Sequence, residues 1–170
     1  MRNNPPTLEQ AMNYADMMEA CASYIAVKNP TIKEPSKVFD IMAPLFQNAK
    51  QESLFIIMLD TKSKIIGAPC ELFRGLLDSC PTHPREVFRL AIRDCAAALI
   101  IVHNHPSGDP TPSREDIEAT RRLVEAGRII GIPLFDHVII GNRSQITDAP
   151  YISLRERNLV SFASSLHAKD

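Results

Sequence analysis

The sequence predicts an α/β (α+β) domain in which helices flank a mixed sheet, with an extra helix at the N-terminus. Two observations indicate this class. Amphipathic helical patterns alternate along the chain with short apolar runs, which are typical of strands that are covered on both faces. The 170 residues, 45% hydrophobic and 23% charged, are enough for one domain with a sizeable core.

The N-terminal part predicts two helices. The first is LEQAMNYADMMEACASYIAVK, which contains no proline or glycine, and Thr7 and Gln10 at its start have capping-box spacing. The stretch NPTIKEPS ends it, and a second helix is expected from Ser36 to Asn48, bent or split at Pro44. We assign residues 1–35 to a helical extension, 36–160 to the main domain and 161–170 to a tail.

The main domain continues with alternating strands and helices. Strands are expected at 53–60, at 65–70 with continuation towards Gly75, at 97–102, and in the segments FDHVIIG and SQITD. Helices are expected in THPREVFRLAIRDCA, with Cys95 facing inward, and in REDIEATRRLVEAGRIIG. The C-terminal YISLRERNLVSFASSLHAKD is expected to form a short helix that frays.

Charge, cysteines and the N-terminus narrow the class of protein. A net charge of −1 gives no global attraction to nucleic acid or to an anionic membrane. The cysteines form no CxxC pair, so we expect reduced thiols; they are Cys21, Cys70, Cys80 and Cys95. The opening MRNNPPTLEQ leads into no apolar run, so we expect neither a signal peptide nor a membrane span, and a cytoplasmic location.

Two histidines follow the apolar strand at 97–102, in the segment VHNHPSGDPTPSREDIEAT. Side chains at positions i and i+2 of an extended segment point to the same side, so His103 and His105 can face one point while Asn104 points away. Prolines restrict the loop that follows and hold the next helix in place; they are Pro106, Pro110 and Pro112.

That helix begins at a second polar pair. Ser113 is expected to cap it, and Asp116 lies near its positive end, from which a carboxylate can face back towards the histidines. Taken alone, the cap has a structural explanation, and so does an HxH pair. Together they favour a metal site of His103, His105 and Asp116. Such a set leaves one tetrahedral position open, which is the catalytic arrangement for zinc, although other divalent ions also suit it.

The pattern His103-x-His105, seven residues, Ser113-x-x-Asp116 resembles the JAMM motif of the MPN metallopeptidases. The string HNHPSGDPTPS, with HPRE before it and DHVIIG after it, resembles the RadC family's version of this domain, from about Ser36 to Leu159. The resemblance implies a JAB/MPN (cytidine-deaminase-like) architecture and one zinc ion per chain. It also implies a metallopeptidase or isopeptidase in which a zinc-bound water, activated by a glutamate, attacks a protein or peptide substrate.

The resemblance further implies two catalytic residues. The family's general base is a glutamate at the start of the first core strand, which corresponds to Glu52, and Ser113 would donate to the developing oxyanion. Zinc lowers the pKa of its water towards about 7, so a nearby carboxylate can take the proton. From the residues alone, Glu71 and Glu86 would be candidates of equal merit.

Two other zinc-site motifs do not fit this segment. Three consecutive letters HNH are not the dispersed motif of HNH nucleases, and a zinc nucleobase deaminase needs a P-C-x-x-C that this chain lacks. The RadC-like pattern also includes Asp136 and His137, whose role the sequence leaves open. Because it lies within a strand, His137 is expected to be a hydrogen-bonded structural residue and not a fourth ligand.

The RadC name is linked to DNA repair, so the alternative function is an accessory module of repair or of mobile elements. It would bind DNA or protein and use zinc structurally. A basic stripe on one predicted helix favours DNA; it consists of Arg85, Arg89 and Arg93. Glu86 and Asp94 lie beside it and weaken the case. RadC-like proteins carry a glycine-containing helix-hairpin-helix module, and since no glycine precedes Gly67, we expect this chain to lack it.

Overall fold

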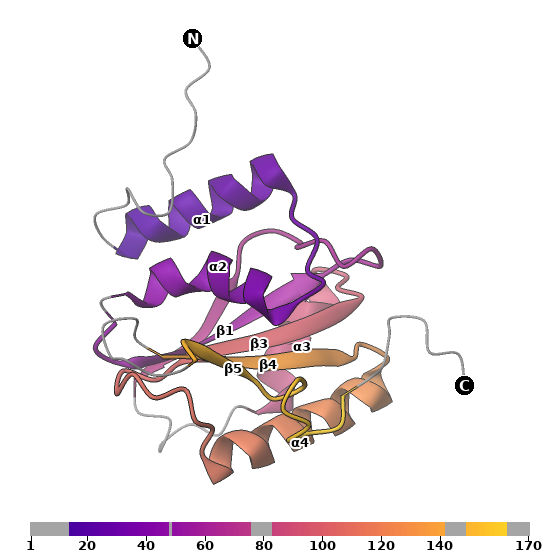
Figure 1. Ribbon diagram of the computed structural model, residues 1–170. Coiled ribbons are helices and arrows are strands. Elements are labelled where there is room, and N and C mark those ends of the chain that lie inside the picture. Colours follow the sequence, from indigo (N-terminus) through magenta and orange to yellow (C-terminus); the bar gives the residue numbers. More distant parts are fainter. Residues whose placement is uncertain (1–13, 48, 76–82, 142–148, 163–170) are drawn as a thin grey trace.

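A computed structural model of the chain describes residues 14–47, 49–75, 83–141 and 149–162 (Figure 1). These residues form helices and strands in the following order: α1 Tyr14–Lys28, α2 Pro35–Phe46, β1 Glu52–Leu59, β2 Cys70–Gly75, α3 Pro84–Arg93, β3 Ala98–Asn104, α4 Arg114–Ile130, β4 Leu134–Ile140 and β5 Tyr151–Ser153. The predicted mixed α/β class is confirmed.

The strands form one mixed sheet in the order β2-β1-β3-β4-β5. Strand β1 pairs antiparallel with both β2 and β3, and β5 pairs antiparallel with β4, whereas β3 and β4 are parallel. A parallel pair needs a crossover, which α4 supplies here. The C-terminal end of β3 therefore leads through the proline loop to the N-terminal end of α4. This junction lies at the end of the sheet where β3 and β4 terminate.

Helices cover both faces of the sheet (Figure 1). On one face α2 lies against the strands and α1 lies outside α2, while α3 and α4 cover the opposite face. The side chains of β1 alternate between these two cores: Phe55, Ile57 and Leu59 belong to the first, and Leu54, Ile56 and Met58 to the second. This double burial explains why the strand reads as a continuous apolar run.

The second strand lies later in the chain than we predicted. Ile65 makes only an isolated bridge to Leu59, and regular pairing with β1 begins at Cys70. The carboxylate of Asp60 accepts hydrogen bonds from two backbone N–H groups of the following turn and so fixes a tight reversal. An apolar pattern does not show how soon backbone pairing resumes after such a turn.

The prediction for Cys95 is wrong, and the split considered at Pro44 does not occur. Cys95 is exposed, with a φ of 53°, because α3 ends at Arg93 and the chain turns there to bury Ala96. Helix α2 is not split at Pro44 and continues through it to Phe46. The apolar side of α2 packs on the sheet, which compensates for the missing backbone N–H.

The C-terminal segment is also different from the expected helix. Tyr151–Ser153 forms β5 on the edge of β4, and residues 154–160 form turns. The open edge of β4 supplies backbone partners that a local helical preference does not outweigh. Some predictions fall on residues outside the described ranges: the SQITD strand, the cap of the first helix, Cys80 and the last residues of the tail.

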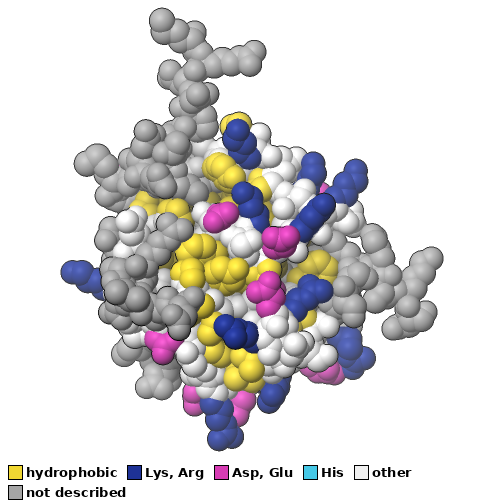
Figure 2. Space-filling view, viewed as in Figure 1, with side chains coloured by type: hydrophobic (Ala, Val, Ile, Leu, Met, Phe, Trp, Pro, Cys, Tyr) yellow, Lys and Arg dark blue, Asp and Glu magenta, His cyan; other side chains and the backbone are white. Residues whose placement is uncertain are grey.

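The described helices include none suited to span a membrane, and the face in Figure 2 carries charges of both signs. No helix in the described ranges has both the length and the hydropathy needed to cross a bilayer. On the face in Figure 2, basic and acidic side chains are interspersed around a central group of hydrophobic ones.

Candidate metal centre

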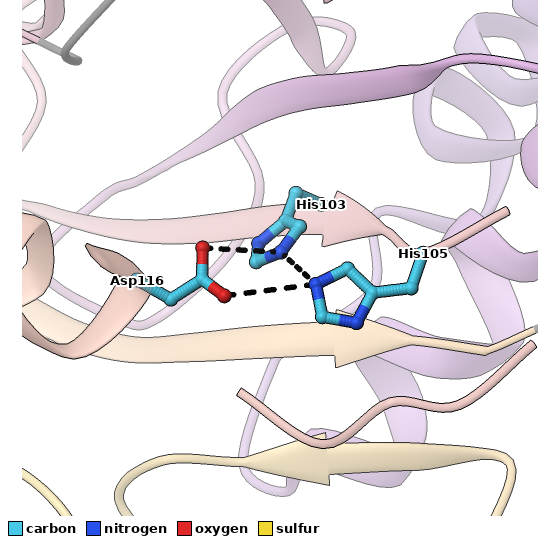
Figure 3. A group of neighbouring side chains, drawn as sticks. All are labelled: His103, His105 and Asp116. Carbon is cyan, nitrogen blue, oxygen red and sulfur yellow. Dashed lines mark hydrogen bonds and ion pairs between the residues drawn. The ribbon is translucent and has the colours of Figure 1, made fainter. Parts of the chain in front are cut away.

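The structure brings together the three residues that the sequence suggests as ligands (Figure 3). The Nε2 atoms of His103 and His105 are 2.8 Å apart. Asp116 Oδ1 lies 3.5 Å from His103 Nε2, and Asp116 Oδ2 lies 3.6 Å from His105 Nε2. The His103 side chain is fully buried, whereas that of His105 is 13% exposed, so the group opens to solvent on the His105 side.

Local structure orients Asp116. Ser113 and Asp116 form a reciprocal capping box: the Ser113 Oγ accepts from the Asp116 N–H, and Asp116 Oδ2 accepts from the Ser113 N–H at 2.8 Å. The Ser113 hydroxyl also donates to Asp116 Oδ2 at 2.6 Å. The carboxylate thus sits over the positive end of α4 in one orientation.

The loop that carries His105 is anchored to the end of β4. The backbone N–H of His105 donates to the Ile140 carbonyl, which extends the β3–β4 pairing beyond β3. A Cβ atom added at Gly141 would lie 2.2 Å from the Gly108 carbonyl oxygen, so only glycine allows this close approach. The loop folds back so that the Asp109 carbonyl oxygen lies 2.7 Å from His105 Nδ1.

A chain of hydrogen bonds behind the histidines defines their tautomers. Thr120 Oγ1 lies 2.6 Å from the carbonyl oxygen of Asp116, and since that oxygen carries no hydrogen, the Thr120 hydroxyl is the donor. His137 Nδ1, 2.6 Å from Thr120 Oγ1, must then donate to it. His137 Nε2 is left as the acceptor for the Nδ1–H of His103, at 2.7 Å.

These hydrogen bonds leave the two Nε2 atoms and the Asp116 carboxylate as acceptors that face one another. The Nδ1–H of His103 is committed to His137 and that of His105 to the Asp109 carbonyl, so both Nε2 atoms present lone pairs beside the Asp116 carboxylate. Acceptors this close require a cation or a proton between them. Ligands about 2.1 Å from one tetrahedral ion lie about 3.4 Å apart, close to the spacings to Asp116. The residues therefore fit a divalent ion.

The electrostatics favour a neutral His103 and an ionised Asp116, whereas His105 takes up a proton more readily than a free imidazole. Burial, with the neighbouring His137, lowers the pKa of His103 well below its usual value, so its imidazole is neutral. Burial alone would raise the pKa of Asp116, but the neighbouring imidazoles of His105 and His103 and the hydrogen bonds from Ser113 outweigh it and keep the carboxylate ionised. For His105, burial lowers the pKa, while Asp116 and the Asp109 carbonyl raise it more.

Glu52, predicted as the general base, lies at the same end of the sheet. It is the first residue of β1, two residues before Leu54, which pairs directly with His103. Because side chains alternate along a strand, Glu52 shares the sheet face of His103. Its charge also contributes to the raised pKa of His105.

The other two candidate glutamates have different surroundings. Glu71 on β2 forms an ion pair with Arg74 at 2.7 Å. Glu86 lies on the exposed side of α3, where it forms an ion pair with Arg85 at 3.1 Å.

The predicted basic stripe lies on the exposed side of α3, and each of its arginines has a carboxylate nearby. The closest atoms are 3.1 Å apart for Arg85–Glu86, 3.8 Å for Arg89–Glu86 and 2.7 Å for Arg93–Asp94. The stripe is thus partly neutralised within its own helix.

The sequence analysis did not identify Thr120, whereas it predicted that His137 is a hydrogen-bonded structural residue. Both ring nitrogens of His137 are hydrogen-bonded within the domain, as expected for a structural residue. Thr120 lies four residues after Asp116, so it shares that face of α4, and this spacing was the available signal.

Comparison with known proteins assigns the chain to a family. A family model described as the RadC-like JAB domain matches residues 32–159, and the chain belongs to this family. A UPF0758 protein of Clostridium perfringens is 49% identical over 129 residues, which are 76% of this chain and 54% of that protein.

Two further relatives carry the same family name. UPF0758 proteins of Symbiobacterium thermophilum and Staphylococcus aureus are each 44% identical, over 82% and 85% of this chain and 57% and 63% of their own lengths. The chain thus spans a little over half the length of these relatives.

Replacing Thr120 by valine is expected to weaken the binding of a divalent ion about 10–100-fold, because the hydrogen bonds that orient His103 lose their end point. The measurement is zinc affinity by competition with a chromogenic chelator. Thr120→Ser keeps the hydroxyl and serves as the control, with affinity close to that of the original chain. Nitrogen-15 NMR of the imidazoles should show a protonated Nδ1 on His103 and His137. An Nε2–H tautomer of His103 would contradict the hydrogen-bond chain.

Asp136 is expected to make stability depend on pH. It is buried, accepts from Ser153 Oγ and from two backbone N–H groups, and burial raises its pKa from 3.8 to about 6. The protonated carboxyl is favoured by the fold, so this contribution is full below pH ~4 and is lost as the pH rises through about 6, by about 3 kcal/mol.

Urea unfolding between pH 4 and 7 checks this expectation. Asp136→Asn should remove the decline in the free energy of unfolding across this range. Asp136→Ala should cost about 2–4 kcal/mol at pH 7, because it leaves buried donors without an acceptor. An unchanged pH slope in Asp136→Asn would show that another group causes it.

Proposed function

We propose that this chain is a zinc-dependent hydrolase that cleaves a peptide or isopeptide bond in a protein or peptide substrate. One observation carries the proposal: two imidazole lone pairs and an ionised carboxylate converge, with tautomers set by hydrogen bonds behind them. Two histidines and one carboxylate are three protein ligands, which is the number found in catalytic zinc sites.

Residues of the chain would supply the general base and the donor for the oxyanion. When bound, the ion supplies a positive charge that acidifies water and polarises a carbonyl. Glu52, on the same sheet face as His103, takes the proton of the attacking water and passes it to the leaving amine. Ser113, whose hydroxyl lies against Asp116 Oδ2, is the donor for the oxyanion, after its O–H turns away from that carboxylate.

This arrangement suits a planar carbonyl, where attack builds negative charge on one oxygen. The opening on the His105 side would give such a carbonyl access to the ligand group, whereas the buried His103 forms the closed side.

The experiment is a screen of the full chain, loaded with zinc, against a broad panel of peptides and of isopeptide-linked probes. We expect at least one probe to be cleaved, with activity abolished by a chelator and restored by zinc. Chelator-sensitive cleavage of DNA that disappears in Glu52→Gln, with the entire panel left intact, would overturn the proposal.

A further inference from the structure

The asparagine between the two histidines holds the backbone on both sides of Glu52. Asn104 Oδ1 accepts from the backbone N–H of Ser53 at 2.8 Å, and Asn104 Nδ2 donates to the backbone carbonyl of Gln51 at 3.1 Å. Asn104 is 3% exposed, so water competes little for either bond. One side chain thus contacts the residue before Glu52 and the residue after it.

These two bonds lie where the backbone ladder stops. The β1–β3 pairing ends at Leu54 and His103, whereas β3 stays paired with β4 as far as Asn104 and Ile140. The last residue of β3 therefore pairs with β4 only, and the first residues of β1 make no further ladder pairs with β3. The carboxamide of Asn104 offers one acceptor and one donor, as a peptide group does, and takes the place of the missing pair.

The other side of Glu52 has a backbone partner in β2. Glu52 pairs with Gly75, the last residue of that strand. Asn104 therefore supplies the second tether of a residue at the very beginning of β1. Since His103 and His105 flank Asn104 in the chain, the element that supplies two ligands also positions the carboxylate that would act beside them.

We infer that Asn104 is a positioning residue for Glu52: it fixes the start of β1 relative to the two histidines. This inference rests on the proposed function, in which Glu52 is the base. A base acts only within hydrogen-bond reach of the proton it takes, and a misplacement of about 1 Å can cost about 100-fold in rate. We call the two hydrogen bonds of Asn104 to Gln51 and Ser53 the clamp. Loss of the clamp therefore lowers turnover and leaves the ligands and the ion in place.

The first arm of the test needs no substrate. Hydrogen exchange of backbone amides is followed by NMR in the metal-free full chain for Asn104→Leu and Asn104→Asp. We expect the Ser53 amide to exchange at least about tenfold faster in Asn104→Leu, with Ile56 in the middle of β1 unchanged. Asn104→Asp keeps the acceptor for Ser53, so its effect there is smaller. Ser153→Ala, which loses a buried hydrogen bond on the distant strand β5, is the matched control and leaves Ser53 unchanged.

The second arm is a double-mutant cycle with a probe that the panel identifies as cleaved. Asn104→Leu should lower kcat at least about tenfold while one zinc ion per chain is retained. In a Glu52→Gln background the same change should have less than about a twofold effect, because there is no base left to position. A merely structural role would reduce the activity of both backgrounds alike.

The outcomes are separable. Unchanged exchange at Ser53 in Asn104→Leu overturns the clamp whatever the activity, and equal losses of kcat in the two backgrounds overturn the positioning role. Full hydrolysis by Glu52→Gln, or no cleavage of any probe, refutes the proposed function and with it the role of Asn104 in catalysis. In that case faster exchange at Ser53 would still show that the clamp exists.

Discussion

The purified chain is expected to bind one zinc ion and to lose it when Asp116 is replaced by alanine. Asp116 supplies the only carboxylate of the described ligand group, and its removal leaves two imidazoles without a negatively charged ligand. Changes in groups that merely orient a ligand cost about 10–100-fold in affinity, so loss of a ligand should cost more than about 100-fold. Elemental analysis after dialysis against trace zinc measures the content directly.

Stability provides an independent measure of the same site. An ion that binds only the folded chain at 100 times its dissociation constant adds about 2.7 kcal/mol to the free energy of unfolding. The original chain should show this gain on addition of zinc, and Asp116→Ala should not. Full zinc content in a His103→Ala, His105→Ala double variant would place the ion elsewhere and rule out this site.

Replacing Glu52 by glutamine is expected to leave only residual hydrolysis while zinc content and fold persist. Glutamine has nearly the same shape but cannot take a proton, and loss of a general base costs about 10²–10⁴-fold in rate. The measurement pairs initial rates on a cleaved probe with elemental analysis and a thermal melt of the same sample.

A matched control is Glu71→Gln, since Glu71 lies on β2 in an ion pair with Arg74. It should retain hydrolysis. If Glu52→Gln loses zinc, Glu52 is a fourth ligand, and water or substrate has no coordination position left on a tetrahedral ion.

Much of the fold could be predicted because local patterns of apolar residues and glycines specify its helices and strands. The run SLFIIMLD predicts β1 because each of its faces packs in a separate core, and Gly131, with a φ of 84°, ends α4 where the pattern places a glycine. The errors occur where partners override local preference. The second strand starts at Cys70 because pairing with β1 decides it, and Tyr151–Ser153 is a strand because β4 offers an edge.

The sequence by itself determined the ligand group, because all of it lies within residues 103–116. Alternation along a strand end, a restricted loop and a capped helix start are local geometries, and together they bring His103, His105 and Asp116 to one point. The base could be assigned only through the family resemblance, since Glu71 and Glu86 are equivalent by pattern.

Only the tertiary structure decided what orients that group. His137 reaches His103 across 34 positions of the chain, and Asn104 reaches Ser53 across 51. Both contacts exist because β3 lies between β1 and β4, and this order follows from the packing of whole helices and strands. Spacing along the chain carries no information about such pairs. The protonation of the imidazoles and the position of the carboxylate therefore depend on the assembled sheet.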